Sequence, residues 1–330
     1  MKSAILVLGL VLGAWQGEGA SKAPAVQEKK ARPPVYDEQA DARADLNAAL
    51  ARAKKDNKRV LVQWGANWCG WCIKLHDVFK SDEAIAKELL YEYEVVLVDI
   101  GQRDKNLDLV AELGATLDQG VPYLTVLDAS GKPLAQQETG ALEVQGQPRH
   151  DTAKVLSFLT EHQPPHLQAQ AVYDAALKRA QAEGKAVFLH IGAPWCGWCH
   201  RLEDWMAGEK VAALLAKDFV DLKIDQDRME GAVELIAKLR GKRGGGVPWI
   251  AFLDAQGKEL AASNNLDDAE RGNVGFPQTD PEVAWFGKML ATARRSITDA
   301  EIEQLKASLI EVRTQREKAA AEKKKATAGS

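Results

Sequence analysis

A duplicated segment constrains this chain more than any other feature of its sequence. Residues 58–75 read KRVLVQWGANWCGWCIKL, and residues 185–202 read KAVFLHIGAPWCGWCHRL. Further on in each copy, Gly120-Val121-Pro122 matches Gly246-Val247-Pro248, and YLTVLDASGKPL matches WIAFLDAQGKEL. Because two separate matches lie in register, we expect two copies of one folding unit.

The two copies share one pattern of predicted elements. An Ala-rich amphipathic helix ends at Asn57 or Gly184, residues that tolerate the left-handed conformation. A buried strand leads into the Cys motif, which begins a helix. After this helix come a second strand, a helix, the Val-Pro, two strands joined by a turn at a Gly, and a final helix. The predicted ranges are 37–55, 60–64, 95–100 and 151–161 in the first copy, and 167–183, 187–191, 220–224 and 281–294 in the second, with Asp280 as N-cap. Strands alternating with helices predict an α/β fold in which helices cover both faces of a mixed sheet.

The pattern divides the chain into five parts. We expect domains at residues 36–163 and 164–296, with Pro164-Pro165 at the boundary, and a disordered polar lead at residues 21–35. The capping box Thr298-Asp-Ala-Glu301 begins one more helix in a Lys-rich tail at residues 297–330. The tail is either a solvated, fraying helix or a polybasic contact for an acidic surface.

The N-terminus has the plan of a secretory signal peptide at residues 1–20. One positive charge precedes a short apolar run at residues 5–12, and small residues follow it. The run is too short for a comfortable transmembrane anchor, so we expect no integral membrane segment after cleavage. This leader predicts a secreted or periplasmic protein. The net charge is −4, and the sequence has no basic stripe outside the tail, so nucleic acid is not an expected partner.

All four cysteines lie in the two C-x-x-C motifs, an arrangement that favours chemistry over structural crosslinking. A Cys at a helix N-terminus is stabilised as a thiolate by unpaired N–H groups and by the helix dipole. Cys69 and Cys196 are therefore the predicted nucleophiles. Cys72 and Cys199, one helical turn later, are the predicted resolving thiols, which release the substrate from a mixed disulfide.

The chain resembles the thioredoxin superfamily through Trp68-Cys69-Gly70-Trp71-Cys72 with Val121-Pro122, and Trp195-Cys196-Gly197-Trp198-Cys199 with Val247-Pro248. The resemblance covers most of residues 36–295 and extends to tandem secreted disulfide isomerases and short periplasmic thioredoxin-like proteins. It implies two thioredoxin-like domains, in which Pro122 and Pro248 are cis, face the sulfurs and hold a protein substrate by its backbone. No nucleotide or flavin fingerprint is present, so we expect the cysteine pairs to act without a cofactor, and with a redox partner that the sequence does not identify.

One departure from the family separates the two copies. Thioredoxin carries a buried acid six residues before its first Cys, whereas this position holds Gln63 in one copy and His190 in the other. A histidine exchanges a proton near neutral pH and an amide does not. We therefore expect His190 to assist proton transfer, so that the second site resolves mixed disulfides faster. The alternative is a packed strand residue without that role.

Aromatic residues near the motifs predict a surface for unfolded or apolar clients. Its candidate members are Trp68, Trp71, Tyr123, Trp195, Trp198 and Trp249; the alternative is that some of these rings pack under the loop. His200, directly after Cys199, is expected to be an exposed helix residue rather than a metal ligand.

Other functions remain open at this point. The C-x-x-C pairs are also compatible with metal binding, although a shared four-thiolate site would need the two domains face to face. Tandem thioredoxin-like domains also serve as non-catalytic chaperones or scaffolds. Among redox functions, the sequence does not separate a reductase, an isomerase and an oxidase.

Overall fold

The computed structural model describes residues 32–264 and 272–328. The predicted signal peptide and most of the predicted lead lie outside these ranges. Val35, the last residue of that lead, is ordered, because its backbone N–H donates to Asn67 Oδ1 at 2.9 Å. The folded part of the chain therefore includes the end of the segment that we expected to be disordered.

The first copy forms a four-stranded mixed sheet with strand order β2-β1-β3-β4. Strand β1 pairs in parallel with β2 and antiparallel with β3, which pairs antiparallel with β4. The elements are α1 (Ala42–Asp56), β1 (Arg59–Gly65), α2 (Gly70–Ser81), α3 (Glu83–Glu92), β2 (Tyr93–Asp99), α4 (Leu107–Glu112), β3 (Tyr123–Leu127), β4 (Pro133–Glu138), the short 3-10 helix η1 (Thr139–Leu142) and α5 (Thr152–Glu161).

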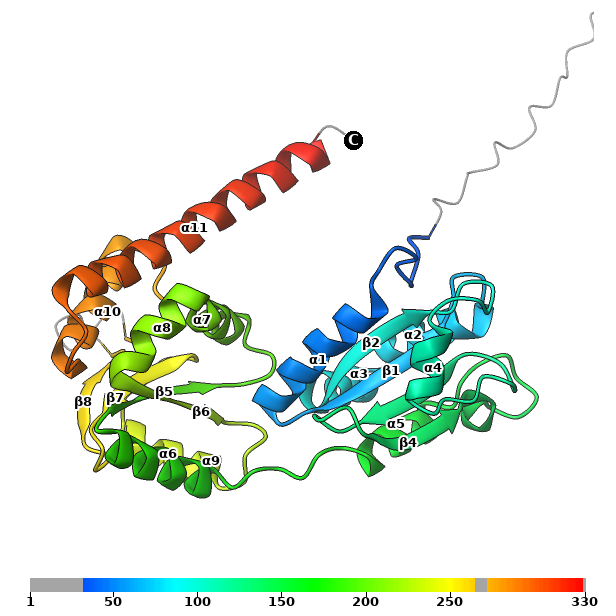
Figure 1. Cartoon of the computed structure of the whole chain (residues 1–330), viewed down its shortest axis with the longest axis horizontal. Helices are drawn as coiled ribbons and strands as arrows, with labels where there is room; N and C mark the ends of the chain where they lie inside the picture. The colour runs from blue at the N-terminus through cyan, green and yellow to red at the C-terminus, as the bar shows by residue number, and fades with distance from the viewer. Residues whose placement is uncertain (1–31, 265–271, 329–330) are drawn as a thin grey trace, which may run out of the picture. The chain divides into compact units, whose positions relative to one another are not determined.

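The second copy repeats this topology in a sheet of order β6-β5-β7-β8. Its elements are α6 (Ala169–Glu183), β5 (Ala186–Gly192), α7 (Gly197–Ala207), α8 (Glu209–Asp218), β6 (Phe219–Asp225), α9 (Ala232–Arg240), β7 (Trp249–Leu253), β8 (Glu259–Ala262) and α10 (Asp280–Ala293), followed by α11 (Asp299–Ala328). Figure 1 shows α6 and α9 on one side of this sheet and α7 and α8 on the other. The predicted mixed sheet with helices on both faces is confirmed in both copies.

Alternation along the first strand of each sheet explains the two-sided core. Val60 and Val62 point into the cluster beneath α1 and α4, whereas Leu61 points into the cluster beneath α2, α3 and α5. In the second copy, Phe188 joins the cluster on the α7 face, and Leu189 joins the cluster on the α6 face. Successive side chains of a strand face opposite sides of a sheet, so a strand made almost entirely of apolar residues is buried on both faces of the sheet.

Local capping fixes the helix ends, and two predicted starts need correction. Helix α1 begins at Ala42 rather than at residue 37, because the Asp41 side chain accepts the N–H groups of Arg43 and Ala44. Its end at Asn57, in the left-handed conformation, is as predicted. Helix α10 is capped by Thr279 and not by Asp280, because Thr279 forms a capping box with Glu282.

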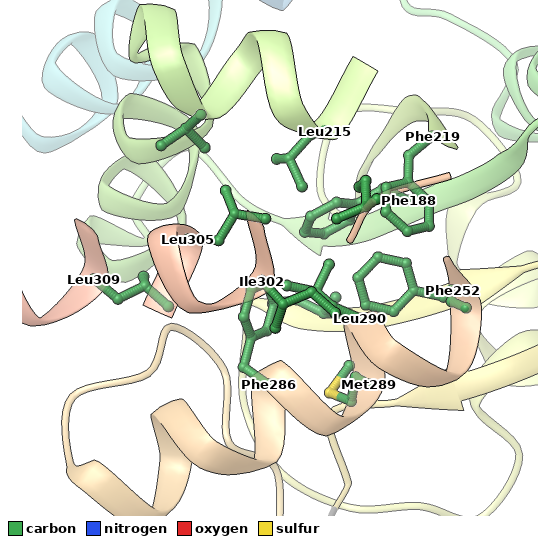
Figure 2. Packing of buried hydrophobic residues seen from close by; sticks show 14 of the residues in the cluster. Phe188, Leu215, Phe219, Phe252, Phe286, Met289, Leu290, Ile302, Leu305 and Leu309 are labelled. Atoms are coloured by element: carbon green, nitrogen blue, oxygen red, sulfur yellow. The ribbon is translucent and has the colours of Figure 1, made fainter. Parts of the chain in front are cut away.

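Helix α11 is the main correction to the predicted tail. Ile302, Leu305 and Leu309 are buried in the core of the second copy, against α10 and the Phe cluster of the sheet (Figure 2). The predicted capping box forms, since Glu301 N–H donates to Thr298 Oγ1. Among the residues of this helix whose side chains are described, only 317–325 have the uniformly exposed character expected of a solvated tail. The helix thus begins as part of the domain and ends outside it.

Within the described ranges, the helices lack a stretch that is long and apolar enough to cross a membrane.

Candidate active sites

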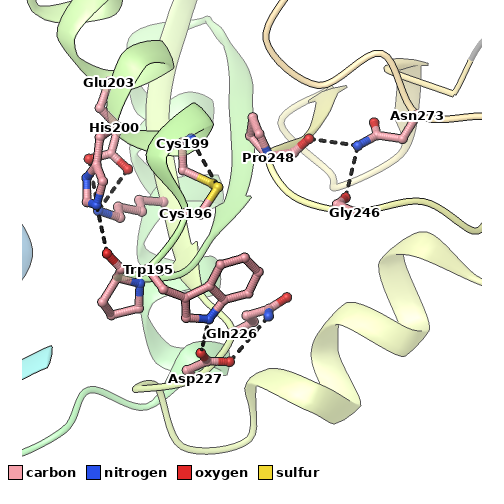
Figure 3. The surroundings of a disulfide bond; sticks show 12 residues. Trp195, Cys196, Cys199, His200, Glu203, Gln226, Asp227, Gly246, Pro248 and Asn273 are labelled. Atoms are coloured by element: carbon pink, nitrogen blue, oxygen red, sulfur yellow. Dashed lines mark hydrogen bonds and ion pairs between the residues drawn. A yellow bond between two sulfur atoms is a disulfide. The ribbon is translucent and has the colours of Figure 1, made fainter. Parts of the chain in front are cut away.

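Each cysteine pair lies where a strand gives way to a helix. Cys69 is the N-cap of α2 and Cys196 is the N-cap of α7, and each Sγ accepts a backbone N–H 3.1 Å away, from Cys72 or Cys199. The two cysteines of each pair form a disulfide, with Cα atoms 5.3 Å apart in the first site and 5.2 Å in the second (Figure 3). The second Cys of each pair is the more buried one. A helix N–H group therefore reaches the sulfur on which we expect negative charge to develop.

A cis-proline loop faces each pair. The Val121–Pro122 and Val247–Pro248 peptide bonds are cis, in agreement with the family resemblance. Val121 O lies 3.3 Å from Cys69 Sγ, and Val247 packs against the second pair. The valine of each cis-proline loop thus lies next to the cysteine pair.

Two residues that sequence reasoning missed hold these loops. Thr139 Oγ1, buried at the start of η1, donates to Pro122 O at 2.6 Å. In the second copy, Asn273 Nδ2 donates to Pro248 O at 2.8 Å and to Gly246 O at 2.9 Å (Figure 3). The two residues differ in type and occupy different segments, so the aligned repeats carry no signal for this role.

Exposed tryptophans flank the sulfurs in an ordered arrangement. Trp68 is 48% exposed and its Nε1 donates to Gly101 O, while Trp195 is 56% exposed and its Nε1 donates to Asp227 (Figure 3). Trp198 is 40% exposed. Since the indole N–H groups are satisfied, the ring faces of Trp68 and Trp195 are held at the surface as apolar contact area.

Two aromatic residues do not belong to this surface. Tyr123 is buried in the core beneath α1, and Trp249 is fully buried with its Nε1 donating to Asn264. Both lie in strands whose every residue is buried, so the inclusion of Tyr123 and Trp249 in a client-binding patch was wrong. These two rings are core packing, as the alternative interpretation held for some members of the patch.

Gln63 and His190 face the helix that carries the cysteines, in equivalent places. Gln63 is fully buried, and its Nε2 lies 3.3 Å from Cys72 O. His190 is 1% exposed; its Nε2 lies 3.0 Å from Asp221 Oδ1, and its buried Nδ1 has no hydrogen-bond partner among the described residues. Burial acts to raise the pKa of Asp221, but its hydrogen bond with His190 and the nearby positive charges, those of Lys55 and Lys223 among them, outweigh it and bring that pKa below its ordinary value.

His200 is half-buried rather than exposed. Its Nε2 lies 2.8 Å from Pro194 O, so the ring is bound to the loop before the motif. Among residues 32–264 and 272–328, no three His, Cys, Asp or Glu side chains gather as metal ligands. The contact with Pro194 O is accordingly a structural explanation for the position of the His200 ring.

His150 lies against Trp71 in the first site, where the second site has Phe276 against Trp198. The ring centroids of Trp71 and His150 are 5.2 Å apart, and neither ring nitrogen of His150 has a hydrogen-bond partner in the described chain. Burial, helped by the positive charge of Lys74, lowers the pKa of His150 to about 4. A neutral imidazole therefore serves as an apolar partner for Trp71.

We expect His150 to make the first domain sensitive to acid. Between pH 6.5 and 4 the unfolded chain takes up a proton on this histidine and the folded chain does not, so stability falls as the pH falls. At pH 4.5 the loss is about 2–3 kcal/mol. Urea unfolding at pH 7 and 4.5, compared between the wild type and His150→Phe, measures it. The variant copies Phe276 and should lose that much less stability on acidification; equal losses would contradict the assignment.

In each copy, two cysteines form a disulfide at a helix N-terminus and face a cis-proline loop on a mixed sheet. This arrangement defines the class of thiol–disulfide exchange sites. The family model for thioredoxin-like proteins matches residues 41–129 and 168–255, and the chain belongs to this family.

Several known proteins resemble the chain over part of its length. Protein disulfide-isomerase erp38 of Neurospora crassa is 29% identical over 189 residues, which cover 54% of this chain and 46% of that protein. Disulfide bond reductase DsbH of Chlamydia pneumoniae is 33% identical over 97 residues, covering 27% of this chain and 57% of DsbH. The chain spans about half the length of the curated relatives it matches. A solved disulphide isomerase from Xylella fastidiosa Temecula1 is 29% identical, with 38% of this chain and 95% of that chain covered and a TM-score of 0.35.

Proposed function

We propose that this protein is a secreted or periplasmic thiol–disulfide oxidoreductase that acts on protein disulfides through two CGWC sites. The observation that carries the proposal is the position of Cys69 and Cys196 as helix N-caps whose sulfurs accept a backbone N–H. That placement favours a thiolate at neutral pH. The names of relatives such as erp38 and DsbH support the same chemistry. The leader-like sequence at residues 1–20 supports the location.

The chemistry uses the two cysteines in turn. With the site reduced, the first thiolate attacks one sulfur of a client disulfide; a mixed disulfide forms, and the other client sulfur leaves as a thiolate. The resolving Cys then loses its proton and attacks the first Cys, which restores the active-site disulfide and releases the second client thiolate. Two electrons pass from the protein to the client. The cis-proline loop and the exposed tryptophans would hold the client during both steps.

The proposal is tested by insulin reduction with dithiothreitol as the electron source. Precipitation of the freed insulin chains should begin earlier with the full chain present than with dithiothreitol alone, and an unchanged time course would overturn the proposal. Equilibration of each pair with glutathione then separates the functions. A potential of about −270 mV indicates a reductase, and one of about −180 mV or higher indicates an isomerase or an oxidase.

We further propose that His190 accepts the proton of Cys199 during resolution. Its buried Nδ1 has no hydrogen-bond partner in the described part of the chain, and its ring lies beside Phe188, which packs with Leu202 of α7. Replacement by glutamine, the residue of the first copy, is expected to slow resolution at the second site about ten- to a hundredfold. The rate is measured on full-length protein carrying Cys69→Ser and Cys72→Ser, so that only the second site reacts. An unchanged rate in His190→Gln would leave His190 as a packing residue.

A further inference from the structure

Tyr36 is buried next to the first cysteine pair, outside both matched repeat segments. It is 1% exposed and packs in one cluster with Cys69 and Cys72. The side-chain position of Gly65 shows how closely they meet: a Cβ there would lie 2.3 Å from Tyr36 Oη and 2.7 Å from Cys72 Sγ. The phenol oxygen and the resolving sulfur therefore border the same small space, which a glycine leaves open.

The second site is built differently at this place. Gly192 is the counterpart of Gly65, and a Cβ on Gly192 would meet only Cys199 atoms, at 3.3 Å, among the described residues. The residue aligned with Tyr36 in the second repeat is Gln163. A tyrosine beside the resolving sulfur is thus a property of the first site.

Asn67 holds Tyr36 in place. Its Oδ1 accepts the backbone N–H groups of Val35 and Tyr36 at 2.9 Å each, and its Nδ2 donates to Tyr36 O at 2.9 Å. The counterpart of Asn67 is Pro194, whose side chain can form none of these bonds. Asn67 and Tyr36 therefore occur together in one copy and are missing together from the other.

Gln63 fixes the hydrogen-bonding role of the phenol. Its Nε2 lies 3.3 Å from Cys72 O, which can only accept, so the nitrogen and not the oxygen of the amide faces this side. The same Nε2 donates to Tyr36 Oη at 2.7 Å. The phenol oxygen is occupied as an acceptor, which leaves its own proton to be donated.

We propose that Tyr36 donates a hydrogen bond to Cys72 Sγ as this sulfur attacks the mixed disulfide, an inference that rests on the proposed function. In that step the Cys72 proton goes to solvent, and the Cys72–Cys69 bond forms as the Cys69–client bond breaks. The client sulfur leaves as a thiolate, and Tyr36 keeps its proton throughout. A donor to the thiolate favours the charged form and holds Sγ in line with Cys69.

Burial keeps the phenol protonated. Burial raises the pKa of Tyr36 well above its ordinary range; the hydrogen bond from Gln63 works against this, and the charge of Asp99 on β2 adds to it. Lys105 Nζ lies 3.4 Å from Asp99 and compensates this carboxylate. Tyr36 is therefore a donor, and not a base, across the pH range in which Cys72 reacts.

The test follows the two thiol steps separately in full-length protein carrying Cys196→Ser and Cys199→Ser. Reduced protein is mixed with 5,5′-dithiobis(2-nitrobenzoate): attack by Cys69 releases one coloured thiolate, and attack by Cys72 releases the second. We expect Tyr36→Phe to leave the first phase unchanged. The second phase should slow about tenfold at pH 7, and the midpoint of its pH profile should rise by about one unit.

Two further variants make the result specific. Tyr93→Phe removes another buried phenol of the same domain, one that donates to Leu159 O, and should change neither phase. Asn67→Ala keeps the phenol but frees its backbone, and should slow only the second phase. If Tyr36→Phe and Asn67→Ala both match the parent in rate and pH midpoint, the inference is wrong. Release of only one coloured thiolate by the parent would instead count against the proposed function itself.

Discussion

Replacing Cys69 and Cys196 together by serine is expected to abolish acceleration of insulin reduction, a loss of at least about a thousandfold. The helix N-terminus can stabilise a thiolate, but a serine hydroxyl stays protonated at neutral pH and cannot exchange with a disulfide. The measurement is the insulin precipitation rate with dithiothreitol in excess. Each single variant should retain the activity of the other site, since each site has its own N-cap cysteine and its own cis-proline loop.

The matched control replaces the resolving residues instead. In Cys72→Ser with Cys199→Ser the nucleophiles remain, so clients should accumulate as mixed disulfides that survive non-reducing electrophoresis and disappear on reduction. The Cys69→Ser, Cys196→Ser protein should form none. Substantial insulin reduction by that second protein, or trapping by it, would show that the roles within each pair are assigned wrongly.

Leu305→Ala is expected to destabilise the second domain by about 2–5 kcal/mol. Leu305 is fully buried among Phe286, Leu290 and the rest of the cluster in Figure 2. Its truncation leaves a cavity, because the neighbouring side chains of a close-packed core cannot move far enough to fill the space. The measurement is the free energy of unfolding in urea. This loss is a large fraction of the 5–15 kcal/mol that holds a typical domain together.

Ile310→Ala is the control on the same helix. Ile310 is 38% exposed, so its truncation removes little buried surface and should cost less than about 1 kcal/mol. Helix propensity rises on alanine substitution at both positions and cannot explain a difference between them. Equal effects of the two variants would mean that α11 does not pack on the domain as described.

Much of the fold was predictable from short-range patterns. The repeat, the buried first strands and the hairpin turns at Gly131 and Gly257 all depend on residues close together in the chain. The helix end at Asn57 is equally local, because only a few residue types adopt that conformation readily. The position of a cysteine at the start of α2 and of α7 was predictable for the same reason, because the C-x-x-C motif and the strand before it are neighbours in the chain. The starts of α1 and α10, at Ala42 and Asp280, were misplaced because several residues nearby are capable caps.

Local patterns were enough to predict two copies of one domain, each with a cysteine pair at a helix start and a Val-Pro loop after it. The residues that surround those pairs come from distant segments and were not predictable in this way. Tyr36 reaches Cys72 through Asn67, more than thirty residues along the chain, and Leu305 reaches the sheet from a helix that reads as a polar tail. Such contacts carry no periodicity or spacing of their own. They arise because a buried surface must be filled and its polar groups paired, whichever segment supplies the atoms.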